Sequence, residues 1–269
     1  MITAEESRNS QDYGFHGSGT GSVHLESDQM LPEKQIAELA KDGATFMTAT
    51  SLCQSKLGEI EKSPQDEPRL AAEAKAALAS AAASVTLPDI KAELQRRLSA
   101  LDDDARRDAE SAKRVAAVTN QPAFDFSAKD LDGHTHHLSD YRGNVVVLDF
   151  WYRGCGWCMQ AMPQINQIAD DFKGKPVVVL GMNTDTNPAD TRFVIDAMKL
   201  RYQTLVIDRD AVEKFKVDCF PSLLVIDARG IVRVFDEGYS ETLRENMDKK
   251  IQGVVDAIPS PASEAKAGK

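Results

Sequence analysis

The sequence predicts an α/β domain, in which a mixed central sheet is flanked by helices, after an all-helical domain. Short apolar runs alternate with helical patterns after Pro122. Before that point, apolar residues recur at three- and four-residue steps. We therefore expect a disordered tail over residues 1–30, a helical hairpin or small bundle over 31–119, the α/β domain over 120–258 and a disordered tail over 259–269.

The helical domain is predicted from one long apolar stripe and two shorter ones. The first stripe includes Ile36, Met47, Cys53 and Ile60. The helical pattern breaks at three prolines, Pro64, Pro68 and Pro88. Because the stripes are narrow and rich in alanine, this domain is a candidate for dimerisation or for docking to a partner.

The α/β domain is predicted element by element. Strands are expected at 123–130, 134–140, 144–152, 177–185, 203–208, 221–227 and 231–238. Helices are expected from Cys155 onwards and at 189–200, 210–217 and 241–258. The run 144–152 is almost continuously apolar, as central parallel strands are.

Composition excludes several classes of protein. The chain has 32 basic and 42 acidic residues and a net charge of −10, which argues against a nucleic-acid partner. No apolar run approaches the roughly 18 residues of a membrane span. The first residues lack the basic and apolar regions of a signal peptide, so the sequence leaves the compartment open between cytoplasm and periplasm.

The strongest motif is Cys155-Gly-Trp-Cys158, where a predicted strand meets a predicted helix. A C-x-x-C pair at such a junction is typical of a redox dithiol. Unpaired N–H groups of the first helical turn would favour the Cys155 thiolate, and Cys158 would lie one turn further on the same face. Arg153 is either a second source of positive charge for this thiol or an exposed loop residue. The alternative for the pair is half of a zinc site, which lacks its other two ligands.

Asp149 lies within the apolar strand, six residues before Cys155. A buried carboxyl group has a raised pKa, which would suit an acceptor for the proton of Cys158. The alternative is that Asp149 reaches an exposed edge of the sheet.

Other cysteines and histidines are weaker candidates. Cys53 is expected to be buried and inert, and Cys219 is either a small core residue or a former of mixed disulfides. His134 and His136 would share a face of a strand and could chelate a metal, but no carboxylate at clear ligand spacing completes the set. We therefore expect exposed histidines, no metal and no organic cofactor.

Residues from Pro122 to about Ile258 resemble the thioredoxin superfamily, and most closely the TlpA/ResA-type thiol–disulfide oxidoreductases with redoxin or AhpC/TSA-like domains. The resemblance rests on the C-x-x-C pair, on Pro163 in the helix after it, and on the stretch Val217-Asp-Cys-Phe-Pro221. It implies a thioredoxin fold, a cis-proline at Pro221 facing the dithiol, and a Phe220 backbone that pairs with substrate. Gly156 and Trp157, between the cysteines, join this expected substrate-binding surface.

The sequence departs from these families at several positions. Gly154 replaces the usual tryptophan before the first cysteine, and Trp157 replaces the proline of thioredoxins. Ala161 replaces a glutamate found in many relatives, while Asp149 follows the thioredoxin pattern. The Pro-x-x-x-Thr-x-x-Cys pattern of peroxiredoxins is missing.

The predicted function is thiol–disulfide exchange with protein disulfides, in the reducing direction. Cys155 is the nucleophile, Cys158 resolves the mixed disulfide and Asp149 handles the proton. Electrons must then come from an upstream thiol carrier. The alternatives are a redox-inactive thioredoxin-fold scaffold that binds a partner through its helical domain, and a thiol peroxidase. By the resemblance the compartment would be periplasmic or otherwise extracytoplasmic.

Overall fold

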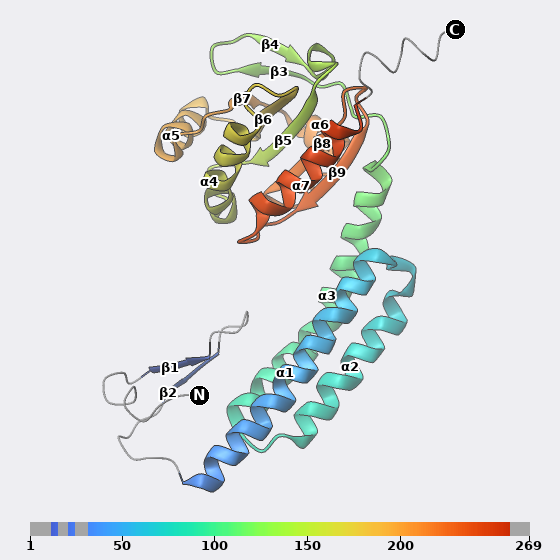
Figure 1. The fold of residues 1–269 in the computed structure, drawn as a ribbon, viewed down its shortest axis with the longest axis vertical. Coiled ribbons are helices and arrows are strands. Elements are labelled where there is room, and N and C mark those ends of the chain that lie inside the picture. The colour runs from blue at the N-terminus through green and yellow to red at the C-terminus, as the bar shows by residue number, and fades with distance from the viewer. Residues whose placement is uncertain (1–11, 16–20, 25–31, 259–269) are drawn as a thin grey trace. The chain divides into compact units, whose positions relative to one another are not determined.

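The computed structural model describes residues 12–15, 21–24 and 32–258 (Figure 1). The chain divides into two compact units, Met1–Glu59 with Pro68–Ala105 and Ile60–Glu67 with Arg106–Lys269. Two long helices, Glu33–Lys62 and Pro88–Val118, contribute residues to both units. The domain boundary at residues 119 and 120 stays a prediction.

The helical region contains three helices, as the proline breaks predict. They are α1 (Glu33–Lys62), α2 (Glu67–Ser84) and α3 (Pro88–Val118), with a short 3-10 helix, Pro64–Asp66, between the first two. In the first unit α2 buries one face, consisting of Leu70, Ala71, Ala74, Leu78, Ala81 and Ala82. The apolar stripe of α1 is only partly buried, because Ile36 and Met47 are about half exposed.

The second unit is built on a seven-stranded mixed sheet in the order β4-β3-β7-β6-β5-β8-β9. Its strands are β3 (Ser127–Asp130), β4 (Thr135–His137), β5 (Val145–Trp151), β6 (Val177–Asn183), β7 (Gln203–Val206), β8 (Ser222–Ile226) and β9 (Val232–Glu237). The three strands β5, β6 and β7 are parallel, and the remaining pairings are antiparallel. The expected mixed sheet is therefore confirmed.

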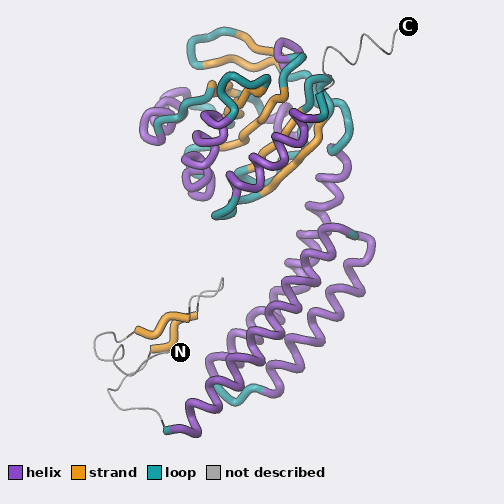
Figure 2. The backbone as a smooth tube through the Cα atoms, viewed as in Figure 1, coloured by secondary structure: helices purple, strands orange, loops and turns teal. Residues whose placement is uncertain are grey.

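Helices cover this sheet (Figure 2). They are α4 (Gly156–Asp171), α5 (Pro188–Met198), α6 (Arg209–Lys214) and α7 (Leu243–Asp256), and a 3-10 helix spans Leu138–Tyr141. All seven residues of β5 are buried, because β6 and β8 flank this strand and both of its faces are covered. On one face Val145 and Val147 pack with Ile165 of α4 and Met247 of α7.

The opposite face of β5 packs into a second cluster. Val146, Leu148 and Phe150 lie there with Phe126 and with Phe215, which follows α6. Odd-numbered residues of β5 thus face α4, and even-numbered residues face away from it. This alternation decides which residues of β5 share a side of the sheet with the cysteines.

Part of the expected N-terminal tail has a defined structure. Asp12–Phe15 (β1) pairs antiparallel with Gly21–His24 (β2), which differs from the disorder expected there. The rest of segment 1–30 and the expected tail at 259–269 lie outside the described residues. Across the described part of the chain, no helix has both the length and the apolar character needed to cross a membrane.

Candidate active site

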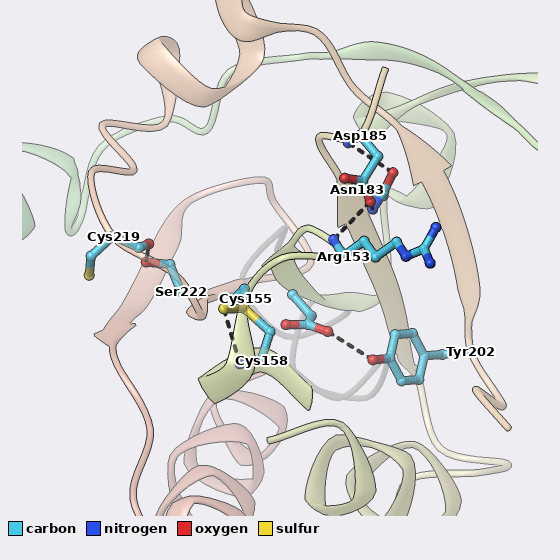
Figure 3. Close-up of a disulfide and its surroundings, with 9 residues drawn as sticks. Arg153, Cys155, Cys158, Asn183, Asp185, Tyr202, Cys219 and Ser222 are labelled. Atoms are coloured by element: carbon cyan, nitrogen blue, oxygen red, sulfur yellow. Dashed lines mark hydrogen bonds between the residues drawn. A yellow bond between two sulfur atoms is a disulfide. The ribbon is translucent and has the colours of Figure 1, made fainter. Parts of the chain in front are cut away.

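Cys155 and Cys158 lie where β5 gives way to α4 and are joined by a disulfide bond (Figure 3). Cys155 is the N-cap residue of α4, so the helix begins at Gly156, one residue after the start that the sequence predicts. Its sulfur accepts a hydrogen bond from the backbone N–H of Cys158, 3.1 Å away. A helix N-terminus presents such unpaired N–H groups and favours a negative charge at the N-cap, so this position would stabilise a Cys155 thiolate.

The two cysteines differ in access to solvent. Cys155 is 5% exposed and Cys158 is 1% exposed, so Cys155 offers the outer sulfur. Little of the pair is open to solvent, because Trp151 and Met162 pack around it and Phe220 borders the same cluster.

Asp149 lies in the interior of the sheet, which excludes the exposed-edge alternative. It is 1% exposed and shares the α4 side of β5 with Val147 and Trp151. Its Oδ2 accepts a hydrogen bond of 2.8 Å from the Tyr202 hydroxyl, whereas Oδ1 has no partner among the described residues. Burial raises the pKa of Asp149 to about 7, and the Tyr202 hydrogen bond opposes that rise.

Pro221 follows a cis peptide bond, as the resemblance implies. Its carbonyl oxygen accepts a hydrogen bond of 2.8 Å from the N–H of Gly238, at the end of β9. Phe220, just before it, makes an edge contact with Tyr152, with ring centroids 5.3 Å apart. The Pro221 loop therefore lies between the disulfide cluster and the β9–α7 loop.

The residues between the cysteines face outward. Trp157 is 59% exposed, and a Cβ added to Gly156 would meet no atom within 4 Å. The Trp157 ring stacks on Tyr239, with centroids 5.7 Å apart. Sequence analysis missed Tyr239. The available signal is its position directly after Gly238, in the loop that leads into the last helix.

Arg153 pairs with a residue of α5 and not with the cysteines. Its guanidinium forms an ion pair with Asp190 of α5 and lies over the Phe193 ring, 4.4 Å from the centroid. In Figure 3 its side chain extends away from Cys155. Asp190 neutralises this charge, so the structure does not support the alternative in which Arg153 activates the thiol.

The other two cysteines stand apart from this pair as free thiols. Cys53 of α1 is half-buried and Cys219 is exposed. Partial burial raises the pKa of both thiols, which disfavours their thiolates at neutral pH. Because Cys155 and Cys158 are bonded to each other, the structure gives no support to the half-site for zinc.

The histidine cluster differs from the expectation in one respect. Asp130 Oδ2 lies 3.2 Å from Nδ1 of His134 and 3.1 Å from Nε2 of His136, so a carboxylate does accompany the histidines. The sequence signal for this carboxylate is the position of Asp130, four residues before His134 and across the turn at Gly133. His134 is exposed as expected, whereas His136 is half-buried and its Nδ1 contacts the Tyr141 hydroxyl at 2.9 Å.

Comparison with known proteins agrees with this geometry. Residues 119–235 match the AhpC/TSA family. A thiol-disulfide oxidoreductase ResA from Geobacillus kaustophilus is 28% identical over 144 residues, which are 53% of this chain and 81% of that protein. A thioredoxin-like protein, YneN, from Bacillus subtilis is 27% identical over 52% of this chain and 83% of its own length.

A solved structure also overlaps this region. It is the thioredoxin domain of a thiol-disulfide oxidoreductase from Bacteroides vulgatus, with 25% identity and a TM-score of 0.46. The overlap covers 49% of this chain and 97% of that one. From the family match and the ResA relatives, we conclude that the C-terminal region of this chain is similar to the TlpA/ResA-type redoxins with AhpC/TSA domains, that it has the thioredoxin fold, and that the protein is a thiol–disulfide oxidoreductase.

Proposed function

We propose that the Cys155–Cys158 pair reduces disulfide bonds of protein substrates. The observation that carries the proposal is the position of Cys155 at the N-cap of α4, with Cys158 one turn further and Asp149 on the side of β5 that α4 covers. The reducing direction follows the ResA-type resemblance.

The reaction begins with the reduced pair. The Cys155 thiolate attacks one sulfur of a substrate disulfide, that disulfide breaks, and a mixed disulfide forms. The first substrate thiolate leaves and takes a proton from water. Cys158 then gives its proton to Asp149 and attacks the Cys155 sulfur, so the mixed disulfide breaks and the second substrate thiolate leaves. Two electrons pass to the substrate, and an upstream thiol carrier must return two electrons to the protein.

Four residues around the cysteine pair are proposed to bind the substrate, and of these Gly156 and Trp157 are exposed. Gly156 and Trp157 border the disulfide on the helix side, and Phe220 and Pro221 border it on the loop side. The backbone of Phe220 would pair with the substrate chain. Dimerisation or docking through the helical region stays a prediction.

Reduction of insulin with dithiothreitol as electron donor tests the proposal. Wild type should accelerate insulin precipitation, and Cys155→Ser should fall to the uncatalysed rate. Cys53→Ser is the matched control, because it removes a thiol in the helical region, and it should keep wild-type activity.

Equal activity of Cys155→Ser and wild type would contradict the proposal and favour the redox-inactive scaffold. Peroxide consumption measured in parallel tests the peroxidase alternative. The reduction potential of the pair tests the direction, because a reductant is expected near about −270 mV and an oxidant near about −120 mV.

A further inference from the structure

One buried contact of the site is not required by cysteine chemistry, the hydrogen bond between Tyr202 and Asp149. Asp149 lies on β5 and Tyr202 just before β7, with β6 between these two strands. In the register of the sheet, Asp149 lies beside Gly181, and Gly181 lies beside Thr204. The Tyr202 side chain must therefore cross β6 to reach the carboxylate.

Gly181 makes this crossing possible. A Cβ at position 181 would lie 2.9 Å from Thr204 Oγ1, 2.9 Å from Trp151 Nε1 and 3.2 Å from a ring carbon of Tyr202. Carbon atoms of side chains do not approach polar atoms so closely without displacing them. A glycine inside a strand marks such a close approach, and here it lets a tyrosine ring lie over the strand.

Because the Tyr202 side chain crosses β6, the two oxygens of the Asp149 carboxylate differ in their hydrogen bonding. Oδ2 accepts the Tyr202 hydroxyl at 2.8 Å, while Oδ1 is buried without a partner among the described residues. Tyr202 and Asp149 are 9% and 1% exposed, so water has little access to this contact.

Few titratable groups face Asp149. The strands beside it contribute Gly181 and Leu223, which do not titrate. From α4 and its N-cap the nearby buried cluster contains the sulfurs of Cys155 and Cys158, and α7 contributes Leu243, Met247 and Ile251 to that side of the sheet. Within the described structure, Tyr202 is thus the group whose hydrogen bond acts on Asp149.

We infer that Tyr202 is a positioning residue for proton transfer: held over Gly181, its hydroxyl fixes Asp149 through Oδ2 and leaves Oδ1 as the oxygen that accepts the Cys158 proton. This inference rests on the proposed exchange reaction. A donated hydrogen bond stabilises the charged carboxylate, so it keeps Asp149 available as a base despite its burial.

Tyr202→Phe removes the hydroxyl and leaves the ring in place. Burial then acts on Asp149 unopposed, and its titration midpoint should rise by about 1 pH unit, the effect of one hydrogen bond to a charged group. Gly181→Ala, which pushes the ring away from the strand, should move the midpoint in the same direction. Tyr141→Phe is the matched control, since it removes a hydroxyl that bonds His136 in the same unit.

Two readouts separate this inference from the proposed function. The first is the ¹³C carboxyl titration of Asp149 in the oxidised protein, where neither cysteine titrates. The second is the pH profile of insulin reduction, whose acidic limb should rise with the carboxyl midpoint in Tyr202→Phe and stay in place in Tyr141→Phe. In an Asp149→Asn background, Tyr202→Phe should no longer move the profile.

An unchanged Asp149 midpoint in Tyr202→Phe, or an equal shift in Tyr141→Phe, would overturn the inference. A shifted midpoint with an unshifted acidic limb would likewise overturn it, because Tyr202 would then have no part in the proton transfer. If wild type fails to reduce insulin at every pH, the proposed function fails, and with it the proton transfer assigned to Tyr202, even where the carboxyl titration shifts.

Discussion

The backbone N–H of Cys158 donates a hydrogen bond to the Cys155 sulfur across 3.1 Å, within the first turn of α4. This contact shows that the helix N-terminus donates its hydrogen bond to the Cys155 sulfur and not to the Cys158 sulfur. In the reduced protein the same N–H would stabilise a negative charge on Cys155, while Cys158 lies deeper and faces the side of the sheet that carries Asp149.

Alkylation of the reduced protein should therefore be selective. At about pH 7 we expect iodoacetamide to modify Cys155 about 10-fold faster than Cys158, because the helix N-terminus lowers a thiol pKa. Cys53 and Cys219 should also react slowly, since burial raises their pKa. Peptide mapping by mass spectrometry over a time course measures these rates. Preferential labelling of Cys219 would contradict the assignment of the nucleophile.

Asp149→Asn should stabilise the oxidised protein at alkaline pH. The folded pKa of Asp149 is raised to about 7, so the folded state binds a proton that the unfolded state has already lost. Its favourable contribution is complete below the unfolded pKa of about 3.9 and is lost as the pH rises through about 7.

The variant should match wild type near about pH 4 and exceed its unfolding free energy by about 2–4 kcal/mol above about pH 8. Urea unfolding at the two pH values measures this difference. A gap of the same size at both values would show that Asp149 does not titrate in this range.

The stacked pair of Trp157 and Tyr239 should contribute to the binding of protein substrates. It should not contribute to the binding of small disulfides. Tyr239→Ala removes an aromatic contact of about 0.5–1.5 kcal/mol, so KM for insulin should rise about 2- to 10-fold. The rate with oxidised glutathione should stay at the wild-type value. Phe193→Ala, which removes an exposed ring beside Arg153, is the control. Equal losses with both substrates would place Tyr239 in the structural support of the cysteines.

Asp42 is predicted to support the helical region without affecting exchange. Its Oδ2 accepts hydrogen bonds from the backbone N–H groups of Thr86 and Leu87 and from the Thr86 hydroxyl, at 2.7–2.9 Å. These bonds tie α1 to the loop before α3. Asp42→Ala leaves these donors unpaired, so the helical circular dichroism signal should melt several degrees lower while insulin reduction is retained. Glu61→Ala, an exposed carboxyl of the same helix, should melt as wild type does.

Local patterns predicted much of the fold. The apolar run at 144–152 became β5, the hairpin at Arg229 and Gly230 joins β8 to β9, and the proline breaks separate three helices. Each of these signals lies within a few neighbouring residues, where turn chemistry and apolar periodicity act directly.

Contacts between residues far apart in the sequence could not be predicted from such local patterns. Tyr202 reaches Asp149 only because three strands adopt one register and the middle strand carries Gly181 at the crossing. Tyr239 stacks on Trp157 of α4, and the loop that carries Tyr239 is bonded through Gly238 to the Pro221 carbonyl, so three segments distant in sequence meet there. The ion pair of Arg153 could not be predicted for the same reason, since its partner Asp190 belongs to α5. Neither the spacing nor the type of these residues indicates such pairings before the sheet is assembled.

The most direct measurement for the central claim is the trapping of a mixed disulfide with Cys158→Ser. In this variant Cys155 can still attack a substrate disulfide, but no second thiol can release the adduct. The reduced variant incubated with insulin should accumulate an adduct in which non-reducing peptide mapping joins Cys155 to an insulin cysteine, and Cys155→Ser should yield none. An adduct formed through Cys219, or continued insulin reduction by Cys158→Ser with no adduct, would contradict the account.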